Sequence, residues 1–305
     1  MTADYYRKKT TDLLNNVEMP RSSGYTTALR NIGSIRNSGF ELQLDGRIID
    51  RAVKWDLGVN FSLNRSKVLV LSEDKDIFGG ELDNTILKDQ LNLMRVGEPM
   101  YVFYGYVEDG YDENGHIVYK NMDDDPAITA ADKTIIGDPN PDFLVNLTTA
   151  VSYKGFTLSA FFQSSIGNDI YSLSMAAQAY DYGYNGNTLR EVYYNHWTLE
   201  NPTAKYPNLD QTSYKMSDRF VYDGSFVRLK NLELAYDVPC ARNKFIKRAR
   251  VYVSAQNLFT ITSYPFWDPD INANGGGSSM IQGVDSYCYP SARTYTCLLY
   301  TSDAA

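Results

Sequence analysis

The sequence is poor in the residues on which most catalytic and metal centres depend. Its 305 residues include three cysteines and two histidines, His116 and His196. The cysteines, Cys240, Cys288 and Cys297, have no metal-ligand spacing and form an odd set, so neither a metal cluster nor a disulfide framework is predicted. P-loop, G-x-S-x-G and G-x-G-x-x-G motifs are missing. The sequence therefore favours a protein that is not an enzyme and requires no cofactor.

Excess positive charge and long apolar runs are also lacking. A net charge of -8 argues against a nucleic-acid partner, because a surface that follows phosphates needs surplus Lys and Arg. No run approaches the roughly 20 apolar residues of a membrane helix. Membrane β-strands escape that test, since they need only about 10 residues and half of these face the lumen. Residues 1–6 contain no apolar signal region, which indicates either a chain that stays inside the cell or an internal piece of a longer precursor.

The chain does show two-residue alternation of apolar and polar side chains. Between positions 54 and 64, five apolar side chains alternate without an error with polar residues or glycine: Trp55, Leu57, Val59, Phe61 and Leu63. This pattern is typical of a strand with one apolar and one polar face. Similar patterns predict eight strands in all, at about 3–12, 37–49, 53–65, 142–153, 155–165, 219–237, 248–259 and 289–299.

The predicted connections alternate between short and long. Tight turns are expected at 49–53, 154–155 and 237–247, and long polar connections at 14–36, 66–141, 166–218 and 260–286. Several loops above about 15 residues are uncommon in a compact domain. If the strands run up and down, all long connections lie on one side. The pattern therefore predicts an all-β fold, an antiparallel transmembrane β-barrel segment with turns on one side of the membrane and long loops on the other.

Six segments, which occur in order and span nearly the whole chain, carry a family resemblance. They are NIGSIRNSGFEL at 31–42, IGDPNPDF at 136–143, YKGF at 153–156, FQSSIGNDIY at 162–171, SFVRLKN at 225–231 and AQNLFT at 255–260. Together they resemble the C-terminal part of the SusC/RagA-type TonB-linked (TonB-dependent) outer-membrane transporters. Residues 1–305 would then be about eight strands of a TonB-dependent receptor β-barrel domain, without its plug and N-terminal regions.

The resemblance implies a barrel of about 22 strands with an internal plug, in the outer membrane of a gram-negative bacterium. Its implied role is import of oligosaccharides or peptides with energy passed through TonB. The implied partners are a SusD-like surface lipoprotein, outer-membrane lipid, a glycan or peptide substrate and, only through missing N-terminal regions, the TonB complex. Residues 296–305 depart from the family's final strand because they end without an aromatic residue, so we expect an atypical tail there.

Segment 121–132 resembles a twelve-residue calcium loop. Side-chain oxygens stand at positions 1, 3, 5 and 12, and a backbone carbonyl is available at position 7: Asn121, Asp123, Asp125, Asp132 and Ala127. Two features depart from the pattern, because Pro126 replaces the usual Gly and the last ligand is Asp rather than Glu. The segment is therefore either a Ca²⁺ site or an acidic, solvated turn.

Aromatic residues gather in two of the long connections. One group is Tyr180, Tyr182, Tyr184, Tyr193, Tyr194 and Trp197, and the other is Tyr264, Phe266 and Trp267. Rings interleaved with Asn and Asp suit sugars, whose C–H faces stack on aromatics, and they suit protein partners equally well. Packing within the loops is the third interpretation.

Two function classes remain open from these patterns. The first is the barrel wall, with substrate- and lid-contacting loops, of an outer-membrane importer. The second is a secreted all-β glycan-binding domain or glycosidase, although no carboxylate pair stands out among 37 acidic residues. The apolar residues from Trp55 to Leu63 distinguish the classes. In a barrel they form an outward band, whereas in a sandwich they pack against a second sheet.

Overall fold

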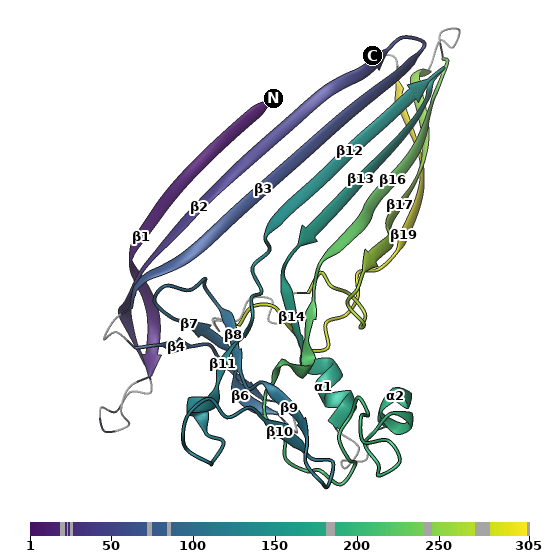
Figure 1. Cartoon of the computed structure of the whole chain (residues 1–305). Coiled ribbons are helices and arrows are strands. Elements are labelled where there is room, and N and C mark those ends of the chain that lie inside the picture. Colours follow the sequence, from purple (N-terminus) through teal and green to yellow (C-terminus); the bar gives the residue numbers. More distant parts are fainter. Residues whose placement is uncertain are drawn as a thin grey trace.

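Eight long strands form one antiparallel sheet in a computed structural model of the chain (Figure 1). The structure describes every residue except 19–21, 23, 25–26, 72–74, 84–86, 181–186, 241–245, 272–280 and 304–305. The sheet follows chain order: β1 (Thr2–Glu18), β2 (Thr27–Asp50), β3 (Val53–Leu71), β12 (Phe143–Tyr153), β13 (Phe156–Ile166), β16 (Phe226–Val238), β17 (Ile246–Thr262) and β19 (Thr294–Asp303). The prediction of eight antiparallel strands is confirmed.

Tight turns and long connections lie at opposite rims of the sheet, as predicted (Figure 1). Two residues separate β2 from β3, and two separate β12 from β13. In the second turn, Lys154 and Gly155 have φ values of 46° and 86°. Positive φ at both central residues defines the type I′ turn, whose twist matches that of the flanking strands. The sequence therefore specifies this hairpin through its Lys-Gly pair.

Strand boundaries differ from the prediction at the long-loop rim. Most of the connection expected at 14–36 is strand, because β1 and β2 stay paired out to Glu18 and Thr27. Two-residue alternation of apolar and polar residues is interrupted there, since Leu13 and Leu14 are consecutive and the ladder shifts register around them, while the backbone pairing continues. β16, by contrast, is shorter than predicted and begins only at Phe226. Before it, Asp218–Phe220 form a 3₁₀ turn and β15 (Val221–Asp223) pairs with a loop strand.

One face of the sheet is apolar across strand after strand. A single row of directly paired residues crosses six strands: Leu44, Val59, Leu147, Phe162, Leu229 and Phe259. The neighbouring row points the other way and is polar: Gln43, Asn60, Asn146, Gln163, Arg228 and Thr260. We call the second set the polar row. Because side chains alternate along every strand, the in-register pairing sorts apolar and polar residues onto opposite faces.

The apolar face has the features of a lipid-facing wall. Several of its aliphatic side chains are about half exposed, including Leu158 at 47%, Leu234 at 50% and Val253 at 52%. Aromatic contacts flank this zone, with Phe40 and Phe61 toward the loop rim and Phe156 on Tyr236 toward the turn rim. The apolar stretch from Trp55 to Leu63 spans roughly 26 Å along the strand. Exposed aliphatics between aromatic girdles are typical of a membrane barrel.

The main buried core lies in the long loops, and none of the outward side chains named above belongs to it. A sandwich would bury those side chains against a second sheet. Among the described residues, the small additional sheets are formed only by loop segments. The structure therefore favours the barrel wall over the soluble sandwich. No helix among the described residues is long and apolar enough to cross a membrane.

Within the described residues, the loops contain short strands and two α-helices. The strands are β4 (Ile77–Phe78), β5 (Glu81–Asp83), β6 (Lys88–Gln90), β7 (Asn92–Met94), β8 (Val102–Gly105), β9 (Glu108–Tyr111), β10 (Ile117–Tyr119), β11 (Thr134–Gly137), β14 (Asp169–Ser172), β15 and β18 (Val284–Asp285). The helices are α1 (Leu173–Tyr180) and α2 (Arg190–Tyr194). They lie beyond the long-loop rim, away from the tight turns (Figure 1).

The C-terminal segment pairs as an ordinary last strand. Its residues from Thr294 to Asp303 pair with β17 in a ladder that has one irregularity, near Arg248. Tyr295, Cys297 and Leu299 stand opposite outward residues of β17 and so extend the apolar face. The tail expected to be atypical in sequence therefore keeps the alternation that a wall strand requires.

Candidate functional site

Three long connections remain between the wall strands: the first loop (72–142), the second loop (167–225) and the third loop (263–293). Their described residues fold into one body with a shared core. Its buried residues come from all three: Leu91 and Phe103 from the first, Tyr171 and Phe220 from the second, and Val284 from the third. Burying these side chains together removes apolar surface of all three loops from water, which stabilises the loops as a unit. The loops are therefore an ordered unit set on the rim of the sheet.

Two buried polar contacts tie the loops to one another. Arg219 donates to Glu108 at 2.7 Å, and Ser217 donates to the same carboxylate at 2.6 Å. The pair is largely buried, with side-chain exposures of 16% and 10%. A charged pair of this kind is strongly destabilising to break, because the remaining charge stays buried without compensation. These contacts hold the first loop against the second.

Several of the predicted aromatic contact residues are core residues of the loop body. Tyr180 is buried and stacks on Tyr214, with ring centroids 3.7 Å apart. Trp197 is 9% exposed and packs so closely on Gly115 that a Cβ there would lie 2.3 Å from the indole. Tyr264 is buried, and its hydroxyl donates to Asp285 at 2.6 Å. For these rings the structure supports packing within the loops rather than contact with a ligand.

The remaining predicted aromatics are spread over the surface. Tyr193 and Tyr194 on α2 are 61% and 74% exposed, and their rings meet edge to face at 5.1 Å. Trp267 is 57% exposed and stacks on Phe266, which also packs against the core. Tyr182 and Tyr184 lie outside the described residues. The structure leaves Tyr193, Tyr194 and Trp267 accessible to a substrate or partner.

The acidic loop at 121–132 is held together by backbone hydrogen bonds. Asp132 is fully buried, and its carboxylate accepts from the N–H groups of Met122 at 2.7 Å and Thr129 at 2.8 Å. These hydrogen bonds keep the pKa of Asp132 below its usual range. The Thr129 hydroxyl in turn caps the short 3₁₀ helix Ala130–Asp132. Asp132, which the sequence predicts as a metal ligand, thus forms a capping box with Thr129.

The other expected calcium ligands are engaged in the same way. Asn121, Asp123 and Asp125 each accept from the N–H two residues further on, at 2.8–3.1 Å. Across the described part of the chain, no three His, Cys, Asp or Glu side chains form a group that could hold a metal ion. In this structure Asp123, Asp125 and Asp132 do not form such a group. Calcium binding at Asn121, Asp123, Asp125, Ala127 and Asp132 stays a prediction from the sequence.

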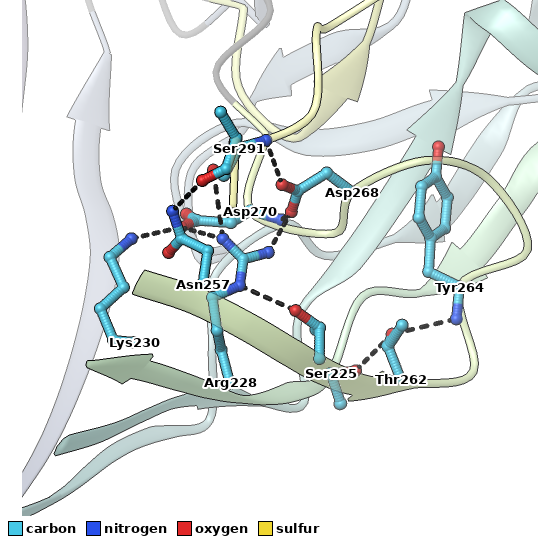
Figure 2. A network of polar contacts seen from close by, with 11 residues as sticks. Ser225, Arg228, Lys230, Asn257, Thr262, Tyr264, Asp268, Asp270 and Ser291 are labelled. Carbon is cyan, nitrogen blue, oxygen red and sulfur yellow. Dashed lines mark hydrogen bonds and ion pairs between the residues drawn. The ribbon is translucent and has the colours of Figure 1, made fainter. Parts of the chain in front are cut away.

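A buried arginine links the sheet to the third loop (Figure 2). Arg228 stands in the polar row on β16 and is 2% exposed. Its guanidinium donates to Thr260 on β17 at 2.9 Å, to Asp270 and Ser291 at 3.3 Å each, and to Asp268. We call this network the Arg228 clasp. Asp268 and Asp270 lie near the start of the third loop and Ser291 lies near its end. The clasp therefore holds both ends of this loop against the polar face of the sheet.

Charges in the clasp are balanced by a second cation and by backbone donors. Lys230 lies 3.8 Å from Asp270, opposite Arg228. Burial opposes ionisation of Asp268, but hydrogen bonds from the N–H groups of Ser291 and Asp270, together with Arg228, keep its pKa below the usual range. Two cations thus face two anions.

The role of segment 225–231 could not be predicted from the sequence, although this segment resembles the family, because the partners of Arg228 lie about 40 residues away.

A cavity of about 270 Å³ lies beside the clasp. Its floor includes Asn146 and Gln163 of the polar row, and Pro139, Pro141 and Gly283 are among the loop residues around it. Gly283 has a φ of 71°, and a Cβ there would lie 2.3 Å from the Pro139 side chain. Glycine therefore allows the third loop to approach the first at this point.

Comparison with known proteins decides the family. A family model described as "TonB dependent receptor-like, beta-barrel" matches residues 1–258. The chain belongs to this family. Among curated relatives, "TonB-dependent receptor P3" of Formosa agariphila is 32% identical, over 97% of this chain and 31% of its own length. "TonB-dependent receptor SusC" of Bacteroides thetaiotaomicron is 29% identical, over 96% of this chain and 29% of its own length.

Solved structures agree with this assignment. A chain in "Structure of the RagAB peptide transporter" superposes with a TM-score of 0.80 at 26% identity, covering 98% of this chain and 32% of that one. The chain thus spans about a third of the length of the relatives that it matches. Eight strands form an open sheet here, as expected for a segment of a TonB-dependent receptor barrel. Outer-membrane barrels turn an apolar face to lipid, and this is the kind of sorting that the apolar and polar rows show.

Proposed function

We propose that this chain forms part of the wall, together with extracellular loops, of an outer-membrane importer in a gram-negative bacterium. The observation that carries the proposal is the pair of adjacent rows across six strands, one apolar and one polar. A wall between lipid and an aqueous lumen needs this sorting. The family assignment supports the same function.

Substrate and partner are part of the proposal. The related chains named SusC and RagAB favour an oligosaccharide or a peptide as cargo, and a SusD-like surface lipoprotein as lid. Energy from TonB would reach the protein through regions outside these residues. The exposed rings of Tyr193, Tyr194 and Trp267 are the loop positions best placed to meet the lid or the cargo. No residue in this arrangement is assigned a covalent role.

The test uses the complete receptor that contains this chain. Leu147→Arg places a charge in the apolar row, where an arginine near the bilayer midplane costs about 2–4 kcal/mol. Asn146→Arg, one residue away, places the same charge on the polar face. We expect the first variant to be depleted from outer-membrane fractions and the second to be inserted. Equal insertion of both variants would contradict the proposal.

Calcium binding at 121–132 stays a prediction from the sequence. Calorimetric titration of the complete receptor with Ca²⁺, beside an Asp125→Ala variant, tests it. Heat of binding in the parent that is lost in the variant would support a site at Asn121, Asp123, Asp125, Ala127 and Asp132. Absence of binding heat in the parent, or equal heat in parent and variant, would contradict the prediction.

A further inference from the structure

The cavity beside the Arg228 clasp has a floor built for hydrogen bonding. Asn146 and Gln163 are directly paired neighbours on β12 and β13, and both line the cavity. The Asn146 side-chain oxygen is buried and, within the described residues, accepts no hydrogen bond. A buried acceptor without a donor is unfavourable by about 1–3 kcal/mol. A ligand N–H or O–H that reached Asn146 would remove this penalty.

The lining makes the cavity electrically neutral. Asp270 is the one ionisable side chain among the described residues that line it. Its carboxylate already faces Arg228 at 3.3 Å and Lys230 at 3.8 Å. A charged ligand group would be desolvated there without a free counter-charge, which is unfavourable. The site therefore suits an uncharged, hydrogen-bonding segment.

The apolar part of the lining distinguishes between two kinds of neutral ligand. Sugar sites usually offer a ring face on which C–H groups stack. Phe226 is the one aromatic residue among the described lining, and it is 5% exposed with the Arg228 guanidinium over its ring at 5.3 Å. The other apolar surface is aliphatic: Pro139, Pro141, Leu144, Ile170, Pro269 and Ile271. These surfaces suit small aliphatic side chains better than sugar rings.

We infer that this cavity is a binding subsite for a short, uncharged peptide segment on the lumen wall. Backbone amide groups of the peptide pair with Asn146 and Gln163, and a small apolar side chain fills the aliphatic hollow. The Arg228 clasp positions the roof by fixing Asp270 and its neighbours over the polar row. The inference rests on the proposed function, because it assumes that cargo passes along the polar face.

The experiment measures peptide retention by the complete, detergent-purified receptor. A tryptic digest of casein is the probe, and retained peptides are eluted and quantified by mass spectrometry. A variant carrying Asn146→Leu and Gln163→Leu loses two hydrogen-bonding partners, and we expect about a tenfold loss of retained peptide. Asn60→Leu is the matched control, because Asn60 pairs with Asn146 in the polar row but does not line the cavity. We expect it to retain peptide like the parent.

Heat-modifiable migration on gels verifies that each variant forms a folded barrel, and Gln163→Ala replaces the double variant if that one does not fold. Unchanged retention in the folded variant would overturn the inference, as would a parent that retains no peptide or that retains a glucose oligomer instead. If another segment of the receptor occupied the cavity, peptide retention would be unchanged in the folded variant. If the parent takes up any solute, the proposed function stands even when the inference fails. Failure of the inference is therefore distinguishable from failure of the proposed function.

Discussion

Arg228 and Asp268 form an ion pair that is almost completely buried, with side-chain exposures of 2% and 8%. They are 40 residues apart in sequence and join the barrel wall to a loop. The carboxylate also accepts from two backbone N–H groups, those of Asp270 and Ser291. The Asp268 carboxylate therefore links Asp270 and Ser291, near the two ends of the third loop, to Arg228.

Replacing the arginine should release this loop. Arg228→Met leaves Asp268 buried without its cation, and breaking a buried pair typically destabilises by about 3–5 kcal/mol. We expect faster hydrogen exchange in peptides that cover 264–271 and 284–293 of the complete receptor. Lys230→Met is the control, since Lys230 is 37% exposed at the rim of the clasp, and a partly exposed pair contributes about 1 kcal/mol or less. Equal exchange in both variants would rule out the clasp.

Acid should weaken the same contact. The pKa of Asp268 is lower in the folded protein than in the unfolded chain, where an aspartate has a value of about 3.9. Its stabilising contribution is therefore complete above that value and is lost as pH falls through the lower folded pKa. We expect hydrogen exchange around Ser291 to increase in that range relative to other loops. Asp268→Asn should abolish this pH dependence, and an unchanged profile in the variant would assign it to other groups.

Two aromatic residues that looked alike in sequence should behave differently. Trp197→Ala removes a buried ring, and such truncations cost about 3–5 kcal/mol. We expect it to make the loop body sensitive to limited proteolysis. Tyr194→Ala removes an exposed ring, so its effect on stability should stay within about 0.5 kcal/mol. If Tyr194 contacts the cargo or the lid, this variant should lower their binding while the proteolysis pattern stays unchanged; the opposite pattern would reverse the two roles.

The wall strands could be predicted from the sequence because the features that specify them, alternation and turn residues, are local in the chain. Alternation from Trp55 to Leu63 follows from a strand that lies between two solvents, and the Lys154-Gly155 turn follows from positive φ. The outer end of β1 could not be predicted, since strict alternation is interrupted at Leu13 and Leu14. The residues of β1 near Glu18 are strand only because β2 pairs with them.

The site was less predictable because its contacts are distant in sequence. Nothing local marks Arg228 as the partner of Asp268, which lies 40 residues away. Residue type alone also does not give a side chain's contacts. Asp132 matches a calcium ligand in spacing and here accepts two backbone N–H groups. Trp197 matches a stacking platform in composition and packs on Gly115. In both cases the fold, rather than the residue type, sets the contacts.

The central claim is that alternate residues of the long strands face lipid and lumen. Nitroxide labels placed one at a time at positions 54–63 of β3, in the complete receptor reconstituted in bilayers, test it most directly. Labels at Leu57, Val59 and Phe61 should collide with oxygen dissolved in lipid, and labels at Gly58 and Asn60 with a water-soluble nickel reagent, giving accessibility with a period of two. Water accessibility at every position, or no alternation, would contradict the account.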